Sequence, residues 1–448
     1  MECTNLNKQM IPGILKLNSK TKYGLTSRNV PLYLFRPLDV LLKPCIVGCS
    51  AKHVSTNLLG LVNVEKWEDE KLTRGHLVRI IGECGNQQAE EEALVLKHTK
   101  TKWKKNYVLE SKQTAHRFVD GYTFNVDPPG CRDIDDAITI GEDGFIYIVI
   151  ADVSATITPE LFEKASKIGQ TLYKNGIPIA PLLPIQEECS LDLCRKRKAI
   201  ALKFKWENQK ISNLGFEKVE IINQESFTYE SIYLSKYSSF LKELSKTITG
   251  NDSEDSKEWI ASLMMFYNFE VAKQLLKNKK GLLRIQDKPS NEKLEMYANI
   301  PDLTFMSNKA ASYACVSTEK THWTLQRHYC HATSPIRRFA DIVNQLALYN
   351  EDIPDFNIDV LNDLEKNSKM FERDMFFLQT LLSSNSREVQ AIVVSDHRIW
   401  VPEWKRLITC KHSFEQGKKG MLKYSLNMNE DSWKKRMVFR FEDRDCQE

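Results

Sequence analysis

Four aspartates stand within ten residues of one loop that also contains two prolines and a glycine. They are Asp127, Asp133, Asp135 and Asp136. Pro128 and Pro129 fix φ and favour an extended Asp127, and Gly130 lets the chain turn back so that Asp127 can face the other three acids. At a separation of about 5 Å and an effective dielectric near 20, each carboxylate pair repels by roughly 3 kcal/mol. Such a cluster must protonate, move apart into water or hold a divalent cation.

The residues after this loop favour a buried support for it. Residues 137–140 and 145–150 are apolar runs of β-branched and aromatic side chains, joined by the turn 141–144, and they predict a β-hairpin. A solvated acidic turn remains open as the alternative. A calcium loop of the EF-hand type is excluded, because its sixth and twelfth positions would be Ile138 and Gly144. Hard oxygen ligands favour magnesium, manganese or calcium.

A second motif lies about 200 residues downstream, at residues 329–341. Ser334 and Pro335 predict a helix start as N-cap and first helical residue. At 100° per residue, Arg337 would share one flank with Asp341 and Asn344, while Arg338 and Gln345 point the opposite way. A guanidinium beside a helix N-terminus suits a phosphate. The alternative is an ordinary helix in which Arg337 pairs with Asp341 one turn on.

Two segments, VDPPGCRDIDDA (126–137) and YCHATSPIRRFAD (329–341), resemble the signatures of the RNB-domain exoribonucleases, the family of ribonuclease II, ribonuclease R and the catalytic subunit of the exosome. The resemblance implies hydrolytic 3′→5′ digestion of single-stranded RNA to nucleoside 5′-monophosphates with Mg²⁺, or with Mn²⁺. It implies that the four aspartates hold the metal, with Asp127 and Asp136 as the firmest ligands. It also implies that Arg337 stabilises charge on the scissile phosphate and that Ser334 and Arg338 contact RNA.

The same resemblance assigns two tyrosines to RNA binding. Tyr173 precedes a proline-rich passage similar to one in the family and becomes a base-stacking candidate, at the end of a helix expected over 159–173. Tyr229 lies in an FTYE passage similar to the family's LTYE. The resemblance implies that Tyr229 packs against the nucleotide next to the scissile phosphate. Without the resemblance, both would be half-buried core aromatics. Three positions depart from the family pattern: Gln286 and Gln345 replace histidines, and Thr324 replaces a glycine.

The expected fold is a mixed α/β RNB catalytic domain flanked by small all-β barrels of the OB type. Short strands within 14–81 predict an N-terminal OB-fold at 1–98, followed by a basic linker at 99–118 with Trp103 and Tyr107 among its lysines. The catalytic domain is expected at 119–384, with helices over 258–278, ended by Gly281 and assigned to the core, and over 359–383. Strands after 389, with basic residues at 418–419 and 434–436, predict a C-terminal OB-like RNA-binding domain at 385–448.

The composition of the chain indicates the compartment in which the protein works rather than the reaction that it carries out. The 448 residues carry a formal net charge of only +4, so local patches rather than bulk charge must bind RNA. Eleven cysteines without paired spacing suit a reducing compartment, and the N-terminus lacks the features of a signal peptide. The expectation is therefore an intracellular protein, cytoplasmic or nuclear, with no membrane and no disulfide-linked partner; protein partners stay unknown.

Two alternatives to the enzyme stay open at this point. The departures at Gln286, Thr324 and Gln345 keep an RNA-holding relative with an inactive site in contention. A structural magnesium site in a DNA-acting enzyme is the other alternative, although the sequence has no GxxxxGK[ST] loop.

Overall fold

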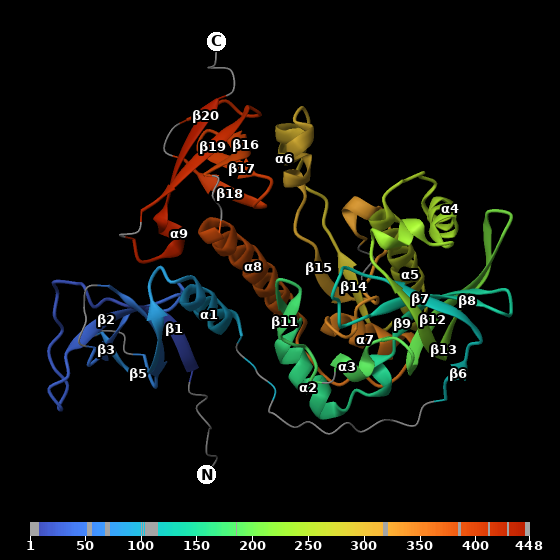
Figure 1. Cartoon of the computed structure of the whole chain (residues 1–448), viewed down its shortest axis with the longest axis horizontal. Helices are drawn as coiled ribbons and strands as arrows, with labels where there is room; N and C mark the ends of the chain where they lie inside the picture. The colour runs from blue at the N-terminus through green and yellow to red at the C-terminus, as the bar shows by residue number, and fades with distance from the viewer. Residues whose placement is uncertain are drawn as a thin grey trace. The chain divides into compact units, whose positions relative to one another are not determined.

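The computed structural model divides into two compact units (Figure 1). The central unit is residues 101–368, and the terminal unit combines residues 1–100 with residues 369–448. No helix among the described residues is long and apolar enough to cross a bilayer. The structure describes residues 9–51, 56–67, 72–99, 101, 103, 115–184, 186–316, 321–383, 387–410, 413–427 and 430–443. Most of the basic linker expected at 99–118, including its lysines and Tyr107, lies outside these residues.

Five strands of the terminal unit close into a barrel of order β1-β2-β3-β5-β4. They are β1 (Gln9–Leu15), β2 (Leu32–Pro37), β3 (Cys45–Gly48), β4 (Leu58–Val64) and β5 (Thr73–Glu83). Alternate side chains such as Leu15, Phe35 and Val62 point inward and are fully buried. Helix α1 (Gln87–His98) follows, with the Asn86 side chain accepting from the backbone N–H of Ala89. The predicted N-terminal barrel is confirmed.

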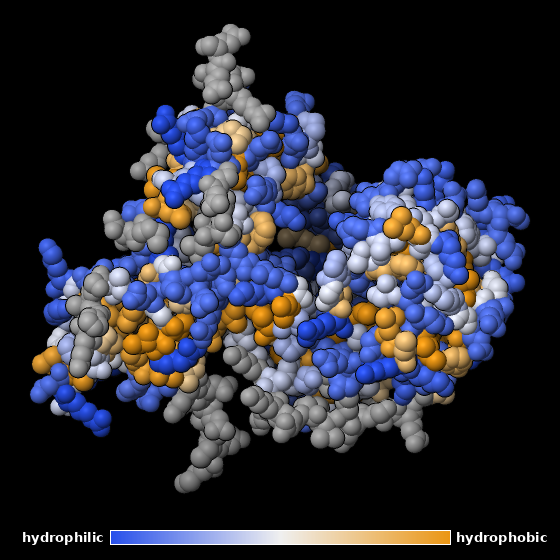
Figure 2. All heavy atoms as spheres, in the orientation of Figure 1, coloured by the Kyte–Doolittle hydropathy of each residue, from blue (hydrophilic) through white to orange (hydrophobic). Residues whose placement is uncertain are grey.

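Part of the barrel surface is apolar. Met10, Leu72, Val78 and Ile80 each keep between 44% and 48% of their surface exposed. Figure 2 shows hydrophobic atoms gathered over the barrel strands, beside a mainly hydrophilic α1. Met10, Val78 and Ile80 face outward from their strands, whose inward neighbours fill the barrel core, and Leu72 directly precedes β5.

The C-terminal strands of the same unit form a five-stranded antiparallel sheet of order β18-β17-β16-β19-β20. They are β16 (Glu388–Ser395), β17 (Arg398–Val401), β18 (Arg406–Thr409), β19 (Lys419–Leu426) and β20 (Met437–Asp443), with α9 (Trp433–Arg436) before β20. Trp404, Trp433 and Phe377 pack together beside this sheet. Phe377 belongs to α8 (Ile358–Ser383), a helix whose residues are shared between the two units.

Two basic residues expected on an RNA-binding surface instead have structural partners. Arg436 is buried, forms an ion pair with Glu90 of α1 at 3.0 Å, and donates to the backbone carbonyls of Glu430 and Asp431. Lys434 forms an ion pair with Asp374 of α8. Arg436 therefore holds the segment before β20 against α1, and RNA binding by the basic residues at 418–419 and 434–436 stays a prediction.

The central unit is built on a sheet of order β12-β9-β8-β7-β13-β6, whose long strands β12 and β13 also pair with each other. Its strands are β6 (Arg117–Phe118), β7 (Gly121–Val126), β8 (Asp136–Gly141), β9 (Ile146–Ala151), β12 (Lys196–Glu207) and β13 (Lys210–Phe227). The predicted hairpin after the acidic loop is β8–β9, with Ile138 opposite Ile148. The acidic loop joins β7 to β8, so the sheet fixes both of its ends.

Helices cover both faces of this sheet, which explains why its strands are apolar without alternation. On one face, Val149 and Ala199 pack with residues of α2 (Pro159–Ile168) and α7 (Phe339–Leu348). On the other, Ile148 packs with residues of α4 (Ser238–Thr249) and α5 (Ser256–Asn278). The remaining elements are β10 (Leu172–Lys174), β11 (Ile177–Ala180), α3 (Gln186–Cys189), β14 (Leu282–Ile285), α6 (Asn291–Tyr297), β15 (Ser312–Cys315) and the 3-10 turns Val153–Ala155, Ser231–Leu234, Pro301–Ser307 and Trp323–Leu325.

The helix predicted over 159–173 ends earlier, at Ile168. Gly169 follows with φ +76°, a left-handed conformation that stops the helix, and Thr171 donates its backbone N–H to the Arg337 carbonyl. Tyr173 therefore lies in β10, which forms a short hairpin with β11. This hairpin also replaces part of the extended loop expected over 176–184. The α5 helix ends at Asn278, as expected, three residues before Gly281, and its C-cap is Lys279.

A buried hydrogen bond between His116 and Asp152 connects the end of β9 to the segment before β6. His116 Nε2 lies 2.8 Å from Asp152 Oδ2, and Ser154 donates to Asp152 Oδ1. Burial alone raises the pKa of Asp152, but the hydrogen bonds from His116 and Ser154 outweigh burial and lower its pKa below the ordinary value. A carboxyl group whose pKa is lower in the folded state stabilises the fold above the unfolded pKa. That contribution should be lost as pH falls below about 4.

Replacing Asp152 with asparagine should lower the free energy of unfolding near neutral pH by about 1–3 kcal/mol, because the buried groups around residue 152 lose one of their two acceptor oxygens. It should also flatten the acid dependence of that free energy. Urea unfolding at neutral pH and in steps down to about pH 3 measures both effects. Asp363→Asn, which breaks an exposed pair with Lys366, is the control and should change neither. An unchanged acid slope in Asp152→Asn would refute this account.

Candidate active site

The acidic loop is shaped by a tight turn. Asp127 directly follows β7, and Cys131 donates its backbone N–H to the Pro128 carbonyl at 3.2 Å. Gly130 has φ +79°, which its lack of a Cβ permits. The chain then returns through Asp133 and Asp135 to Asp136, the first residue of β8. The turn therefore brings Asp127 back towards the other three aspartates, as its sequence predicts.

The four carboxylates have different partners. Asp127 Oδ2 accepts from the Asn125 side chain at 2.8 Å, and Asp133 accepts from the Tyr173 hydroxyl. Asp135 accepts from the Ile336 backbone N–H at 2.9 Å and from Arg337 Nε at 3.1 Å. Within the part of the chain that the structure describes, the Asp136 carboxylate accepts no hydrogen bond. Asp136 and the open side of Asp127 are therefore free to bind a further group.

Burial makes the charged form of three of these acids less favourable. Burial, followed by the nearby charges of Asp127 and Asp135, raises the pKa of Asp136 well above its ordinary value. Burial also raises the pKa of Asp127, despite its hydrogen bond from Asn125. Burial raises the pKa of Asp135 to about 7, although Arg337 and the Ile336 amide act in the opposite direction. The protein alone does not neutralise these carboxylates, and a cation would do so.

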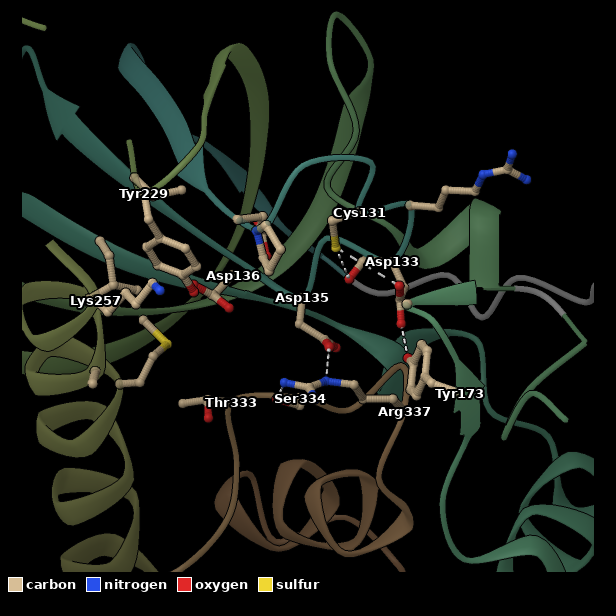
Figure 3. Close-up of a pocket in the computed structure, with 18 of the residues that line it drawn as sticks. Cys131, Asp133, Asp135, Asp136, Tyr173, Tyr229, Lys257, Thr333, Ser334 and Arg337 are labelled. Carbon is tan, nitrogen blue, oxygen red and sulfur yellow. Dashed lines mark hydrogen bonds and ion pairs between the residues drawn. The ribbon is translucent and has the colours of Figure 1, made fainter. Parts of the chain in front are cut away.

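One cavity of about 770 Å³ collects every residue predicted for the site. Its lining includes Asp127, Asp133, Asp135, Asp136, Tyr173, Tyr229, Ser334, Arg337 and Arg338. Figure 3 shows Tyr229 near Asp136 on one side, and Tyr173 with Arg337 near Asp133 and Asp135 on the other. Segments far apart in the sequence thus place acids, a guanidinium and two aromatic rings around a single space.

The start of α7 differs from the sequence prediction. The helix begins at Phe339 rather than at Pro335, and residues 335–337 form a turn. The reason is a backbone pairing: Arg338 bridges Gln170, and Phe339 donates to the Gly169 carbonyl at 2.9 Å. Held in this way, Arg338 has an extended φ of −129° and cannot be helical. Ser334 is therefore not the N-cap of α7.

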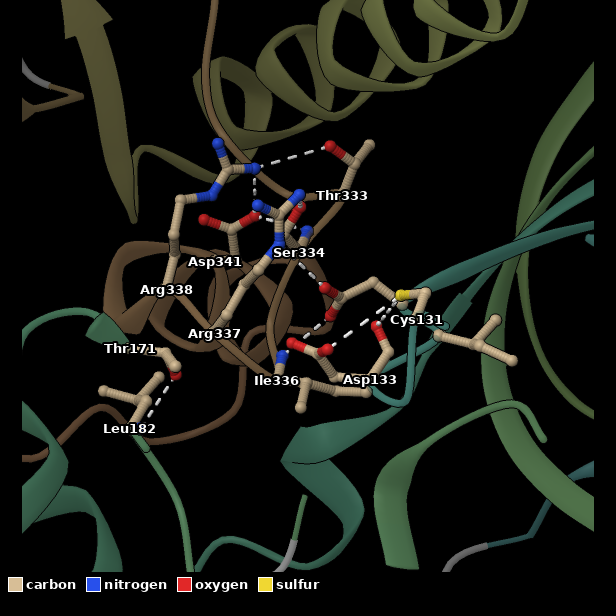
Figure 4. A network of polar contacts seen from close by, with 12 residues as sticks. Cys131, Asp133, Thr171, Leu182, Thr333, Ser334, Ile336, Arg337, Arg338 and Asp341 are labelled. Atoms are coloured by element: carbon tan, nitrogen blue, oxygen red, sulfur yellow. Dashed lines mark hydrogen bonds and ion pairs between the residues drawn. The ribbon is translucent and has the colours of Figure 1, made fainter. Parts of the chain in front are cut away.

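The two arginines of the second motif have separate carboxylate partners (Figure 4). Arg337 pairs with Asp135, keeps 47% of its side chain exposed, and donates from Nη2 to Ser334 Oγ at 3.0 Å. Arg338 pairs with the buried Asp341 at 2.9 Å, and Asp341 also accepts from the Ser334 backbone N–H. The predicted separation of the two arginines holds, but the predicted grouping of Arg337 with Asp341 and the alternative Arg337–Asp341 pair were both wrong.

Helix α5 supplies a cavity wall that was assigned only to the core. Lys257, Ile260, Ala261, Met264, Met265 and Asn268 all line the cavity. Their spacing follows one helical face, but periodicity cannot separate the part of an apolar face that packs from the part that borders a cavity. The Asn268 side chain is fully engaged with Ala332, Tyr329 and Thr333. Asn175, Gly176 and Ile177, at the tip of the β10–β11 hairpin, were also missed.

The three departures from the family pattern have well-defined roles here. Thr324 donates its backbone N–H and its hydroxyl to Gln286 Oε1, at 3.0 and 2.5 Å, so two of the departures contact each other. Gln345 is buried; it accepts from the backbone N–H groups of Val153 and Ser154 and donates to the Ala151 carbonyl. Each substitution therefore satisfies neighbouring polar groups rather than leaving a gap.

The aspartates fit a hard divalent cation in donor type and charge. Carboxylate oxygens are the ligands that magnesium prefers, and the unsatisfied Asp136 lines the same cavity as Asp127 and Asp135. The neighbouring Cys131 thiol is not a competitor, because burial and the acids raise its pKa to about 12. As the side chains stand, no three His, Cys, Asp or Glu side chains of the described residues converge on one point. Ligation by three of them would need their side chains to rotate.

Comparison with known proteins agrees with the fold. The matched relatives include the probable exosome complex exonuclease RRP44 of Caenorhabditis elegans, which is 28% identical over 251 residues, 49% of this chain and 26% of that protein. The aligned part thus spans only about a quarter of the relative's length. Mycoplasma genitalium RNase R, solved in complex with ribose-methylated single-stranded RNA, has a TM-score of 0.75 at 18% identity and covers 99% of this chain and 91% of its own. Yeast Ssd1, a pseudonuclease, has a TM-score of 0.65 at 14% identity, with 95% and 68% covered.

Two family models match the sequence itself. A Dis3-like cold-shock domain 2 (CSD2) matches residues 49–99, within the terminal unit. The RNB domain matches residues 116–234 and 235–351, which together make up more than half of the chain and include every lining residue of the cavity. The family inferred from the two sequence signatures is therefore confirmed: this chain belongs to the RNB-domain family.

Proposed function

We propose that this chain is a magnesium-dependent, hydrolytic 3′→5′ exoribonuclease that degrades single-stranded RNA to nucleoside 5′-monophosphates. The observation that carries the proposal is the cavity in which four aspartates and Arg337 meet two tyrosines. The relatives support it, since RRP44 is named an exonuclease and the matched RNase R structure contains single-stranded RNA. The volume of the cavity is that of a site for one small ligand. It therefore suits the terminal part of a nucleic acid chain.

Asp127 and Asp136 would hold the cation, with Asp133 and Asp135 beside them. When bound, a divalent cation supplies the positive charge that lowers the pKa of water and neutralises phosphate. Arg337 acts on the phosphate itself: its guanidinium has five N–H donors, and Asp135 and Ser334 use only two of them. The Asp135 charge, against the effect of burial, raises the pKa of Arg337 further, so it stays cationic.

Tyr173 and Tyr229 would contact the nucleotides. Both line the cavity on opposite sides of the acids (Figure 3). Stacking of a base on an aromatic ring is worth about 1–3 kcal/mol and tolerates any base. Burial and the hydrogen bond to Asp133 raise the pKa of Tyr173, so its hydroxyl remains a donor that holds the Asp133 carboxylate in place. These contacts favour single-stranded RNA, whose bases are available for stacking.

An RNA-binding protein with an inactive site is the second candidate. Two observations favour it: no three of the described acids converge, and Asp133 and Asp135 already have partners in Tyr173 and Arg337. The fold similarity to the pseudonuclease Ssd1 is compatible with this candidate.

Removing the metal should separate the candidates. With a 5′-labelled single-stranded RNA and magnesium, the enzyme should produce a shrinking ladder, and EDTA should stop digestion without releasing the RNA. Denaturing gels measure the ladder, and a native gel measures the complex. The same strand made of DNA is the matched control and should stay intact. A shift without shortening would support the inactive binder, and digestion of DNA alone would contradict both candidates.

A further inference from the structure

We propose that Lys257 binds a backbone phosphate of the substrate on the side of the cavity opposite Arg337. The inference rests on the proposed function, because it assigns a further contact for the same RNA. No feature of the sequence motifs points to Lys257, which lies outside both of them. It is the second residue of α5 and lines the cavity only because of the tertiary structure.

The second motif places two cations, Arg337 and Arg338, on the cavity wall, and Lys257 differs from both of them. Arg337 is paired with Asp135, and Arg338 is paired with Asp341. Lys257 is exposed, and no carboxylate of the described residues forms an ion pair with it. Its ammonium lies 5.8 Å from the centre of the Tyr229 ring. A cation–π contact at an exposed site is weak, so this ammonium remains available to an anion.

The position of Lys257 matches what a strand of RNA would require. Figure 3 shows Lys257 beside Tyr229 and Asp136, whereas Arg337 lies beside Asp135 and Tyr173. A strand whose scissile phosphate reaches Arg337 and whose next base stacks on Tyr229 would carry a second phosphate towards Lys257. Around Lys257 the α5 wall is apolar, with Ile260, Ala261 and Met264. Lys257 would thus bind the charged phosphate, while the apolar residues of the same wall would contact bases and sugars.

The salt dependence of binding tests this contact directly. Each phosphate contact to a single strand contributes about −0.7 to the slope of log K against log[salt]. Lys257→Met should weaken binding of a fluorescent oligoribonucleotide of about five nucleotides by roughly tenfold and reduce the slope by about 0.7. Lys257→Arg should restore both values. Lys273→Met is the matched control, since Lys273 lies on the same helix, is exposed and pairs with Glu270.

RNA binding is measured in EDTA, which removes the metal that digestion would need. The result therefore does not depend on whether the chain is an exonuclease. If the unchanged chain binds RNA but never digests it, the exonuclease proposal fails while the slope still reports on Lys257. With magnesium, Lys257→Met should raise KM and leave kcat within about threefold. An unchanged slope in Lys257→Met would overturn the inference. If Lys257 instead only neutralises Asp136, the variant would need less magnesium for half-maximal activity at an unchanged slope, and that result would also overturn it.

Discussion

Asp136→Asn should reduce the turnover of single-stranded RNA by about a thousandfold or more and leave RNA affinity nearly unchanged. A divalent cation supplies several kcal/mol of transition-state stabilisation, and each 1.36 kcal/mol is about tenfold in rate. Asp136 is the carboxylate that no described group of the protein satisfies, so its replacement should remove the proposed cation ligand and little else. Because Asp127 and Asp136 repel each other, the variant should also be at least as stable as the unchanged chain. Single-turnover digestion, RNA binding and thermal unfolding measure the three quantities.

Two companion variants sharpen this prediction. Asp135→Asn weakens an acceptor for both Ile336 and Arg337, so it should lose stability as well as turnover. Asp363→Asn, at an exposed residue on α8, makes the same chemical change outside the cavity and should alter neither. Turnover by Asp136→Asn within about tenfold of the unchanged chain would exclude Asp136 as a required ligand.

Glu365→Ala should lower the free energy of unfolding of the central unit by about 3–5 kcal/mol. Glu365 on α8 forms a two-pronged pair with Arg284 on β14, with both N–O distances at 2.6 Å and both side chains buried. Without Glu365, the Arg284 charge would be buried without its carboxylate. Arg284 also stacks on Tyr313, whose hydroxyl bonds the ring of His331 at 2.8 Å, so the loop leading to Ser334 should loosen. Urea unfolding followed by tryptophan fluorescence measures the loss.

Removing both charges should cost less than removing one. The double variant Arg284→Met with Glu365→Leu fills similar volume and leaves no unpaired charge, so it should recover a large part of the stability. A double-mutant cycle on the four proteins isolates the coupling of the pair. If Glu365→Ala alone changes the free energy of unfolding by less than about 1 kcal/mol, the pair does not hold α8 to β14.

The local sequence predicted the structure correctly where the backbone conformation depends on residues that are close together in the chain. The Pro128–Gly130 turn, the β8–β9 hairpin and the five strands of the terminal barrel follow from residues adjacent in the chain, whose backbone preferences and alternation of side chains are local properties. The two signatures identified the family for the same reason, since each is continuous in sequence. The nine residues carried over by resemblance all line one cavity.

Periodicity failed where distant segments compete with a local preference. Pro335 is a favourable first helical residue, yet residues 337–339 pair with residues 169–171 and delay α7 until Phe339. The same pairing and Gly169 shorten α2 and release Tyr173 into a hairpin. A backbone hydrogen bond to a segment about 170 residues away leaves no trace in either local sequence.

The sequence by itself thus determined the family, the sheet strands and the set of acids, because those depend on residue type and short-range spacing. Only the tertiary structure decided which partner each charged side chain has. It assigned Asp135 to Arg337, Asp341 to Arg338 and Glu90 to Arg436, and it brought Lys257 to the cavity. Charge pairing depends on distance and burial in three dimensions, and neither quantity is fixed until the helices have packed on the sheet.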